Sequence, residues 1–230
     1  MAKNNRTKLT PRDCWVVVSA HNEARHIADV VRRIQRQGFP HVIVADDGSQ
    51  DRTARTAKAA GALVVSHTVN LGKGAAMKSG ADYAVAHHAR AIIFLDGDGQ
   101  HKPEELPHFV RELNNGYAIV FGYRKRTGNM PFVRRLGGWF LSTFIRIVYN
   151  MDLKDVLSGY RAMTTAAYRT VRWNARDYSV ESEMIARAGK ACLRYTQFEI
   201  TTIYIDSWKG MSILDGIPIA FKLLWWRMTH

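Results

Sequence analysis

The sequence predicts an α/β protein whose mostly parallel sheet carries helices on both faces. Apolar runs of strand length alternate in the first half with stretches of helical spacing, the pattern of successive strand–helix–strand units. The 230 residues, 47% of them hydrophobic, are enough to bury the core of one domain. The second half is less regular, with no repeat, low-complexity tract or obvious linker.

The first two strands are each followed by a helix. Residues 14–20, "CWVVVSA", form a continuous apolar run, and apolar residues recur at helical spacing from Ile27 to Ile34. Residues 41–45, "HVIVA", precede a helix for which Asp51 is a suitable cap. Both pairs therefore fit one strand–helix unit each.

Three further strands continue the alternation. Residues 62–66 lead through a glycine-rich turn to a helix over about 75–88. The apolar run 91–95 leads to a helix that Pro103 can open at its first turn. Residues 117–123 add a fifth strand.

Charge and cysteine content restrict the partners and the compartment. The net charge of +13 predicts an anionic partner, which can be nucleic acid, lipid headgroups or a phosphorylated substrate. Residues 1–12 form a basic tail without the apolar core of a signal peptide, and no run reaches the roughly 18 apolar residues of a membrane span. Cys14 and Cys192 are both flanked by apolar residues, so we expect two buried thiols in a reducing cytoplasm.

Polar clusters follow four consecutive predicted strands. They read "SAHNEAR", "DDGSQDRT", "NLGKGAA" and "DGDGQH". Each alone is explained by a turn or a helix start. Because ligands of parallel α/β sheets bind outside the carboxyl ends of the strands, their joint placement predicts a ligand site there.

The cluster "DGDGQH" suggests a metal site. "NLGKGAAMKSG" lacks the P-loop spacing, and Met77 stands where the dinucleotide fingerprint needs its third glycine. The calcium-loop pattern fails at its sixth and twelfth positions. Asp96 and Asp98, which bracket Gly97, can still bind one Mg²⁺ or Mn²⁺ through hard oxygen ligands and leave positions for water and a diphosphate.

Together these motifs resemble a known family. "VVVSAHNE", "VIVADDGSQDRT", "NLGKGAA", "IIFLDGDGQHKPEEL", "VFGYR" and "LSGYRAMT" are similar, in this order, to family-2 glycosyltransferases of GT-A fold. The similarity is to the dolichyl-phosphate mannose synthase and polyprenyl-phosphate glycosyltransferase branch, over about 13–216. It implies a GT-A domain over 13–211, with a Rossmann-like sheet, and a C-terminal amphipathic helix over 212–230.

The resemblance also implies roles for individual residues. Asp98 and Arg124 are the expected catalytic residues, and the metal ligands are Asp96, Asp98 and Gln100. The implied donor-binding set is Ser19, His21, Glu23, Ala45, Asp47, Lys73, Asp96, Gly97, Asp98, Arg124 and Lys209. Ser19 and His21 depart from the family pattern and leave the donor base open. The family pattern has basic residues at two positions that hold Ser207 and Ile213 in this chain. Lys209, which lies between them, is the expected substitute.

Two segments suggest contact with a membrane. Cations at 124–126, Arg134 and Arg135 precede the apolar, aromatic stretch 137–149, and residues 212–228 repeat this combination. Such segments suit an anionic membrane interface, although core helices and a solvated charged loop explain them too. The implied ligands of the acceptor phosphate are Arg126, Arg134, Arg135 and Ser158.

The predicted protein is an inverting glycosyltransferase at the cytoplasmic membrane face. It moves a hexose from a GDP- or UDP-sugar to a polyprenyl phosphate. A lipid phosphate needs no catalytic base, and no adjacent acidic pair is present among Asp152, Asp155, Asp177, Glu181 and Glu183. The alternatives are a transferase with a sugar or lipid hydroxyl acceptor, or a basic nucleic-acid-binding module. The intact "DGDGQ" motif, and aromatic residues that do not alternate with cations, argue against nucleic acid.

Overall fold

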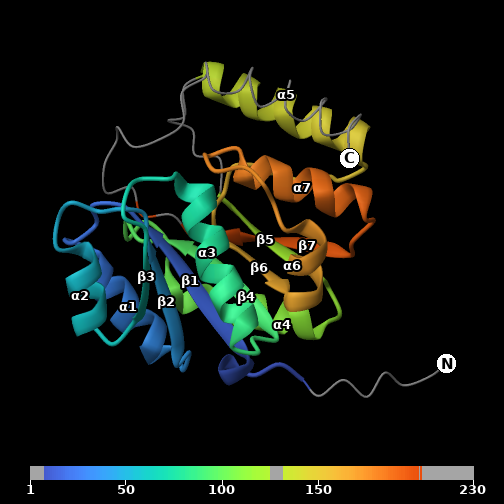
Figure 1. The fold of residues 1–230 in the computed structure, drawn as a ribbon. Coiled ribbons are helices and arrows are strands. Elements are labelled where there is room, and N and C mark those ends of the chain that lie inside the picture. The colour runs from blue at the N-terminus through green and yellow to red at the C-terminus, as the bar shows by residue number, and fades with distance from the viewer. Residues whose placement is uncertain (1–7, 125–131, 202, 204–230) are drawn as a thin grey trace.

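A computed structural model describes residues 8–124, 132–201 and 203, and over 132–140 it describes the backbone (Figure 1). The predictions for Arg126, Lys209 and residues 212–228 therefore lie outside the described residues, as do those for the side chains of Arg134 and Arg135.

Seven strands form one sheet in the order β3-β2-β1-β4-β6-β5-β7. Every neighbouring pair is parallel except the two that include β6, which is antiparallel to both β4 and β5. The strands are β1 Cys14–Ala20, β2 His41–Asp46, β3 Leu63–Ser66, β4 Ala91–Asp96, β5 Ile119–Arg124, β6 Arg161–Thr164 and β7 Tyr195–Ile200. The predicted mostly parallel sheet is confirmed.

Helices cover both faces of this sheet (Figure 1). One face packs on α1 Ile27–Arg36, α2 Thr53–Ala59 and α4 Leu106–Asn114. The other packs on α3 Lys73–Ala86, α6 Thr165–Val171 and α7 Val180–Lys190, and α5 Phe132–Tyr149 lies against α7 on this side. Successive strand side chains point to opposite faces. In β1, Trp15 and Val17 therefore join the second core, and Val16 and Val18 the first.

The predicted start signals lie close to the observed helix starts. Asp51 Oδ1 accepts a hydrogen bond from Thr53 N at 2.8 Å, at the beginning of α2. Pro103 opens the 3-10 turn Pro103–Glu105, and α4 follows it directly. A second 3-10 turn, Pro11–Asp13, leads into β1.

The prediction of two buried thiols is right for Cys14 and wrong for Cys192. Cys14 is fully buried in β1. Cys192 is exposed because it lies in the turn after α7, with a left-handed backbone at φ 50°. Its apolar sequence neighbours belong to the end of the helix and the approach to β7, so they do not bury the residue between them.

Helix α5 has one face in the core. Leu141, Ile145 and Tyr149, spaced by four residues, are buried, which supports the core-helix reading of its inner face. Ile147 is 76% exposed. Within 8–124 and 132–201, no helix is both long and apolar enough to cross a membrane.

Candidate active site

The carboxyl ends of β1 and β4 meet at the centre of the sheet. Ser19 stands beside Asp96 in register, and its Oγ donates to Asp96 Oδ1 at 3.1 Å. Because β6 runs the other way, its first residues lie at this same edge, and Gly159 touches Asp96 there. Lys73 at the start of α3 and Glu181 in the first turn of α7 complete the cluster.

Lys73 joins two buried carboxylates. Its Nζ lies 2.8 Å from Asp96 Oδ1 and 2.9 Å from Glu181 Oε1. Burial penalises the ammonium, but the two carboxylates outweigh that penalty and raise the pKa of Lys73 above its ordinary value. Burial likewise opposes ionisation of Asp96, yet Lys73 and then His101 hold the pKa of that carboxyl well below its ordinary value. The site therefore contains a fixed ion pair at neutral pH.

Asp98 differs from Asp96 in its surroundings. Burial, and then the nearby charge of Asp96, raise the pKa of Asp98 above its ordinary value. Asp98 Oδ1 accepts one hydrogen bond, from Gln100 N at 2.9 Å. Three acids, Asp96, Asp98 and Glu181, lie around the single ammonium of Lys73, so the cluster has an excess of acidic groups that a bound cation would neutralise.

The donor set fits a hard divalent cation in its chemistry. Asp96, Asp98 and the Gln100 amide would supply the oxygen ligands that Mg²⁺ and Mn²⁺ prefer. Among the residues that the structure describes, no group of three or more His, Cys, Asp or Glu side chains is placed to hold a metal ion. A cation here would therefore complete its coordination with water or donor oxygens.

Gly159 and His101 pack directly against the Asp96 carboxylate. A Cβ on Gly159 would lie 2.7 Å from Asp96 Oδ2 and 2.9 Å from Lys73 Nζ, so only glycine fits without moving them. His101 Nε2 lies 3.4 Å from Asp96 Oδ2, and its ring lies against Tyr160. These contacts fix the carboxylate from two sides.

Asp47 fixes the loop that leads into α3. Its carboxylate accepts hydrogen bonds from Leu71 N at 2.9 Å and Gly72 N at 2.8 Å. His67 Nδ1 lies 2.9 Å from the same carboxylate, and His67 Nε2 lies 2.9 Å from Ser79 Oγ. The order serine–histidine–aspartate resembles a hydrolase triad, but here the carboxylate also binds two backbone amides, so it anchors a loop.

The second half of the chain supports the same loop. Gly72 has φ 98°, and a side chain on it would collide with the carbonyl oxygen of Arg176. A side chain on Gly74 would collide with the carbonyl oxygen of Ala175. Trp173 Nε1 donates to Gly74 O at 2.8 Å. The start of α3, and Lys73 with it, is therefore held by residues about a hundred positions later.

Arg124 lies at the end of β5 and pairs with Asp155. Its Nε and Nη2 donate to the two carboxylate oxygens at 2.7 and 3.2 Å. Burial works against the charged carboxyl, but the guanidinium outweighs it and lowers the pKa of Asp155. The predicted catalytic arginine is thus oriented by a carboxylate that the sequence analysis considered only as a base.

Arg161, the arginine of "SGYR", is fully buried and holds the segment before β6. Its guanidinium donates to the carbonyl oxygens of Val156, Ser158 and Glu181 at 2.7–3.0 Å. The Ser158 hydroxyl is buried and has no partner among the described residues. Its predicted contact with an acceptor phosphate stays a prediction.

The other predicted donor residues lie at the same edge of the sheet. His21 Nδ1 is 2.9 Å from the Asp47 carbonyl oxygen, and the backbone N of buried Glu23 donates to Thr53 Oγ1 at 2.8 Å. Ala45 is buried in the core. Gly97 N donates to the Ser19 carbonyl oxygen, so its lack of a side chain is explained by contact with β1. Nucleotide contacts by these residues stay predictions.

A comparison with known proteins identifies the family. The family model described as "Glycosyl transferase family 2" matches residues 15–172, more than half of the chain. The chain belongs to glycosyltransferase family 2. The matched region includes Asp96, Asp98, Lys73 and Arg161, whereas Glu181 lies beyond its end.

Relatives of this glycosyltransferase include enzymes named for lipid phosphates. It is 32% identical to protein MJ1222 of Methanocaldococcus jannaschii over 94% of the chain and 93% of that protein. It is 26% identical to a UDP-N-acetylglucosamine–dolichyl-phosphate N-acetylglucosaminyltransferase of Methanococcus voltae, over 93% of the chain and 96% of that enzyme. The chain is also 26% identical to the polyprenol monophosphomannose synthase of Mycolicibacterium smegmatis, over 92% of the chain and 85% of that enzyme. These relatives confirm the predicted branch.

Solved structures share the fold of this glycosyltransferase. Glucosyl-3-phosphoglycerate synthase from Mycobacterium tuberculosis, solved with Mn²⁺, UDP and glucosyl-3-phosphoglycerate, superposes with a TM-score of 0.70. Identity is 23%, and 96% of this chain and 83% of that chain are covered. At this identity the similarity shows the GT-A fold alone, and it confirms the predicted fold class.

Three residues of the site received no donor or metal role from the sequence. Asp46 ends β2 with a buried Oδ1 that has no partner in the described part of the chain. His101 Nδ1 is also buried and has no hydrogen-bond partner in the described part of the chain. Glu181 was considered only as a base. "DDGS" and "DGDGQH" contain the first two, but Glu181 lies 85 positions beyond Asp96 and no local motif marks it.

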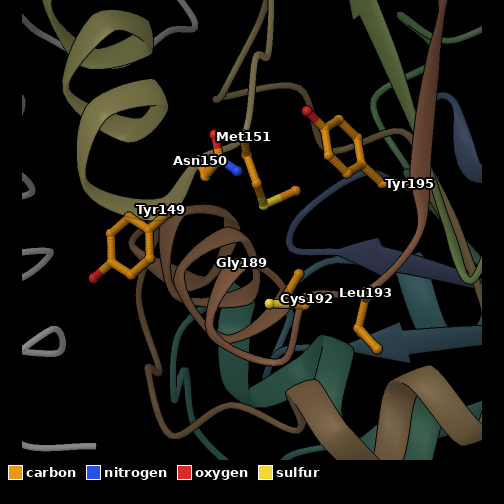
Figure 2. Close-up of a pocket in the computed structure, with 8 residues that line it drawn as sticks. Tyr149, Asn150, Met151, Gly189, Cys192, Leu193 and Tyr195 are labelled. Carbon is orange, nitrogen blue, oxygen red and sulfur yellow. The ribbon is translucent and has the colours of Figure 1, made fainter.

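A pocket of about 200 Å³ lies away from this site (Figure 2). It is bounded by the ends of α5 and α7 and the start of β7, and Met151, Cys192 and Tyr195 line it. β7 is parallel to β5, and β6 is antiparallel to both β5 and β4, so β7 starts at the sheet edge opposite Asp96. The pocket is therefore separate from the candidate active site.

Proposed function

We propose that this glycosyltransferase transfers a hexose from a GDP- or UDP-sugar to a polyprenyl phosphate, with inversion at the anomeric carbon. The observation that carries the proposal is the buried Asp96–Asp98 pair beside Lys73 at the carboxyl end of β4. Relatives named for dolichyl and polyprenyl phosphates support the choice of acceptor.

The donor diphosphate would lie beside Lys73 and the two aspartates. Mg²⁺ or Mn²⁺, when bound by Asp96, Asp98 and Gln100, would neutralise the charge that develops on the leaving diphosphate. Lys73 supplies a fixed positive charge at the same place, and Arg124 supplies a second one at the end of β5. Lys73 and Arg124 would thus help to stabilise the leaving diphosphate.

The acceptor phosphate needs no proton acceptor, because it is ionised at neutral pH. One of its oxygens would form a bond to the anomeric carbon as the bond from that carbon to the diphosphate oxygen breaks. Glu183 cannot serve as a base, because its carboxylate accepts from Asn174 N, Ala175 N and Arg187 Nε at 2.7–3.2 Å. Glu181 is engaged by Lys73.

A peripheral position at the cytoplasmic face of an anionic membrane would present the lipid phosphate to this edge of the sheet. The segments that would make this contact are α5, whose Ile147 is exposed, and residues 212–228. Arg126, Arg134 and Arg135 would bind phosphate groups there.

The runner-up is a transferase with a hydroxyl acceptor. Glu181 favours it, because a buried carboxylate 2.9 Å from Lys73 is the one acid of the cluster outside the predicted metal set. Such an enzyme would need that carboxylate to take the acceptor's proton.

Acceptor assays separate the two. Labelled UDP- and GDP-sugars are incubated with a short polyprenyl phosphate, with the matching polyprenol and with 3-phosphoglycerate. We expect product from the lipid phosphate alone, with the donor's anomeric configuration inverted. Product from the alcohol or from phosphoglycerate but none from the lipid phosphate would refute the proposal, as would a retained configuration.

A further inference from the structure

Glu181 is a buried acid whose carboxylate contacts a site lysine. Its residue is 3% exposed, in the first turn of α7, and its Oε1 lies 2.9 Å from Lys73 Nζ. The backbone around it is also fixed, because its carbonyl oxygen accepts from Nη1 of buried Arg161 at 2.9 Å. The ammonium of Lys73 therefore lies between the carboxylates of Glu181 and Asp96.

We propose that Glu181 is a positioning residue that keeps Lys73 in the donor site when a divalent cation occupies Asp96. This inference rests on the proposed function, because it assumes that a nucleoside diphosphate and a metal bind here. Glu181 would contact neither the sugar nor the reacting atoms.

The charges of the cluster require such a partner. Without metal, Lys73 shares its ammonium between Asp96 and Glu181 at nearly equal distances. If Asp96 held a divalent cation, its carboxylate would no longer compensate the ammonium of Lys73, and the two positive charges would repel each other. A buried charge that loses its partner is strongly unfavourable, so Lys73 would leave the site unless a second carboxylate remained. Glu181 is that second carboxylate.

Two glycines restrict the space around Lys73 and fix the backbone before it. Gly159 packs on its Nζ from one side, with space for no side chain. Gly72, just before it, is pressed against the backbone of Arg176. Retention by Glu181 would leave Nζ beside Asp96, where a diphosphate would lie.

Calorimetric binding of UDP and of GDP, each with Mn²⁺, tests the proposal. The proteins are wild type, Lys73→Met, Glu181→Gln and the double variant. We expect each single variant to bind the preferred diphosphate about 10- to 100-fold more weakly, the range for one hydrogen bond to a charged group. The double variant should bind no more weakly than Lys73→Met, because Glu181 acts through the lysine.

Asp82→Asn is the matched control. It also removes a carboxylate from an ion pair on α3, but at the far end of that helix, where Asp82 binds Arg172. Its affinity for the diphosphate should equal that of wild type. If Glu181→Gln does not fold, Glu181→Asp keeps the charge one methylene shorter and should bind with intermediate affinity.

The outcomes separate this inference from the proposed function. Wild-type affinity in Glu181→Gln, or in Glu181→Asp where only that variant folds, overturns the inference. Additive losses in the double variant overturn it too, because Glu181 would then act independently of Lys73. Unchanged diphosphate binding with lost turnover would instead make Glu181 a base. A wild-type protein that binds neither diphosphate refutes the proposed function itself, and the inference with it.

Discussion

Replacing Gly159 by alanine should disable the site and leave the fold largely intact. The new methyl group would lie 2.7 Å from Asp96 Oδ2 and 2.9 Å from Lys73 Nζ. Ordinary contacts between such atoms are longer than about 3.4 Å, so one or both side-chain ends must move by up to roughly 0.7 Å. The atoms that move are the ends of two side chains, and no backbone atom is among the nearest contacts.

The size of each effect follows from which atoms move. Overpacking of a buried position costs about 1–3 kcal/mol, and the lower end applies because side-chain ends can shift. At about 2–4 °C per kcal/mol for a chain of this size, Tm should fall by only a few degrees. A displacement approaching 1 Å in a catalytic group can cost about 100-fold in rate. Turnover should therefore fall by one to two orders of magnitude.

Differential scanning calorimetry and initial-rate assays with polyprenyl phosphate measure both effects. Gly38→Ala is the control: Gly38 has φ 83°, so alanine is strained there by about 1–2 kcal/mol, but nothing lies within 4 Å of the added atom. This variant should lose similar stability and keep full turnover. Wild-type rates in Gly159→Ala would refute the reasoning, since the contact with Asp96 would then be unimportant.

The remaining predictions concern metal, membrane, thiols and pH. Chelation should stop turnover, and Asp98→Asn should lower it by orders of magnitude with an unchanged melting curve; activity in metal-free buffer would contradict the site. Neutralising Arg134 and Arg135 should weaken sedimentation with anionic liposomes, and added salt should do the same; an unaffected double variant would count against the membrane contact. A thiol reagent should label Cys192 alone in the native protein, and both cysteines in denaturant, as mass spectrometry can show. Burial, and then the charge of the neighbouring Asp13, raise the pKa of the Cys14 thiol from 9.0 to about 12. Between pH 9 and 12 the folded chain keeps a thiol proton that the unfolded chain loses. The free energy of unfolding should therefore fall as the pH rises from 9 to 12, by up to about 1.4 kcal/mol per pH unit. In Cys14→Ala this fall should be smaller.

The first half of the fold was predictable because its signals are local. Each of the first five strands is an apolar run, and Asp51 and Pro103 mark the starts of α2 and α4. Since the carboxyl ends of parallel strands share an edge, the grouping of Ser19, Asp96 and Lys73 followed from position alone.

The second half was not predictable in the same way. β6 is only four residues long, Arg161–Thr164, and its antiparallel position between β4 and β5 depends on pairings across the whole sheet. Glu181 reaches the site through that arrangement, and Asp155 becomes the partner of Arg124 through it. Long-range contacts of this kind leave no periodic trace in the sequence.

The reversed direction of β6 has a consequence for the order in which the site forms during synthesis. Asp96 and Lys73 leave the ribosome well before Gly159 and Glu181, and at about 5–20 residues per second the interval is several seconds. During that time β4 has an open edge where β6 will pair, and the ammonium of Lys73 lacks its second carboxylate. The nascent chain therefore carries Asp96 and Lys73 without Gly159 and Glu181, which contact them in the folded protein. Because Glu181 follows β6 in the chain, the cluster around Lys73 can be complete only after α7 has also left the ribosome.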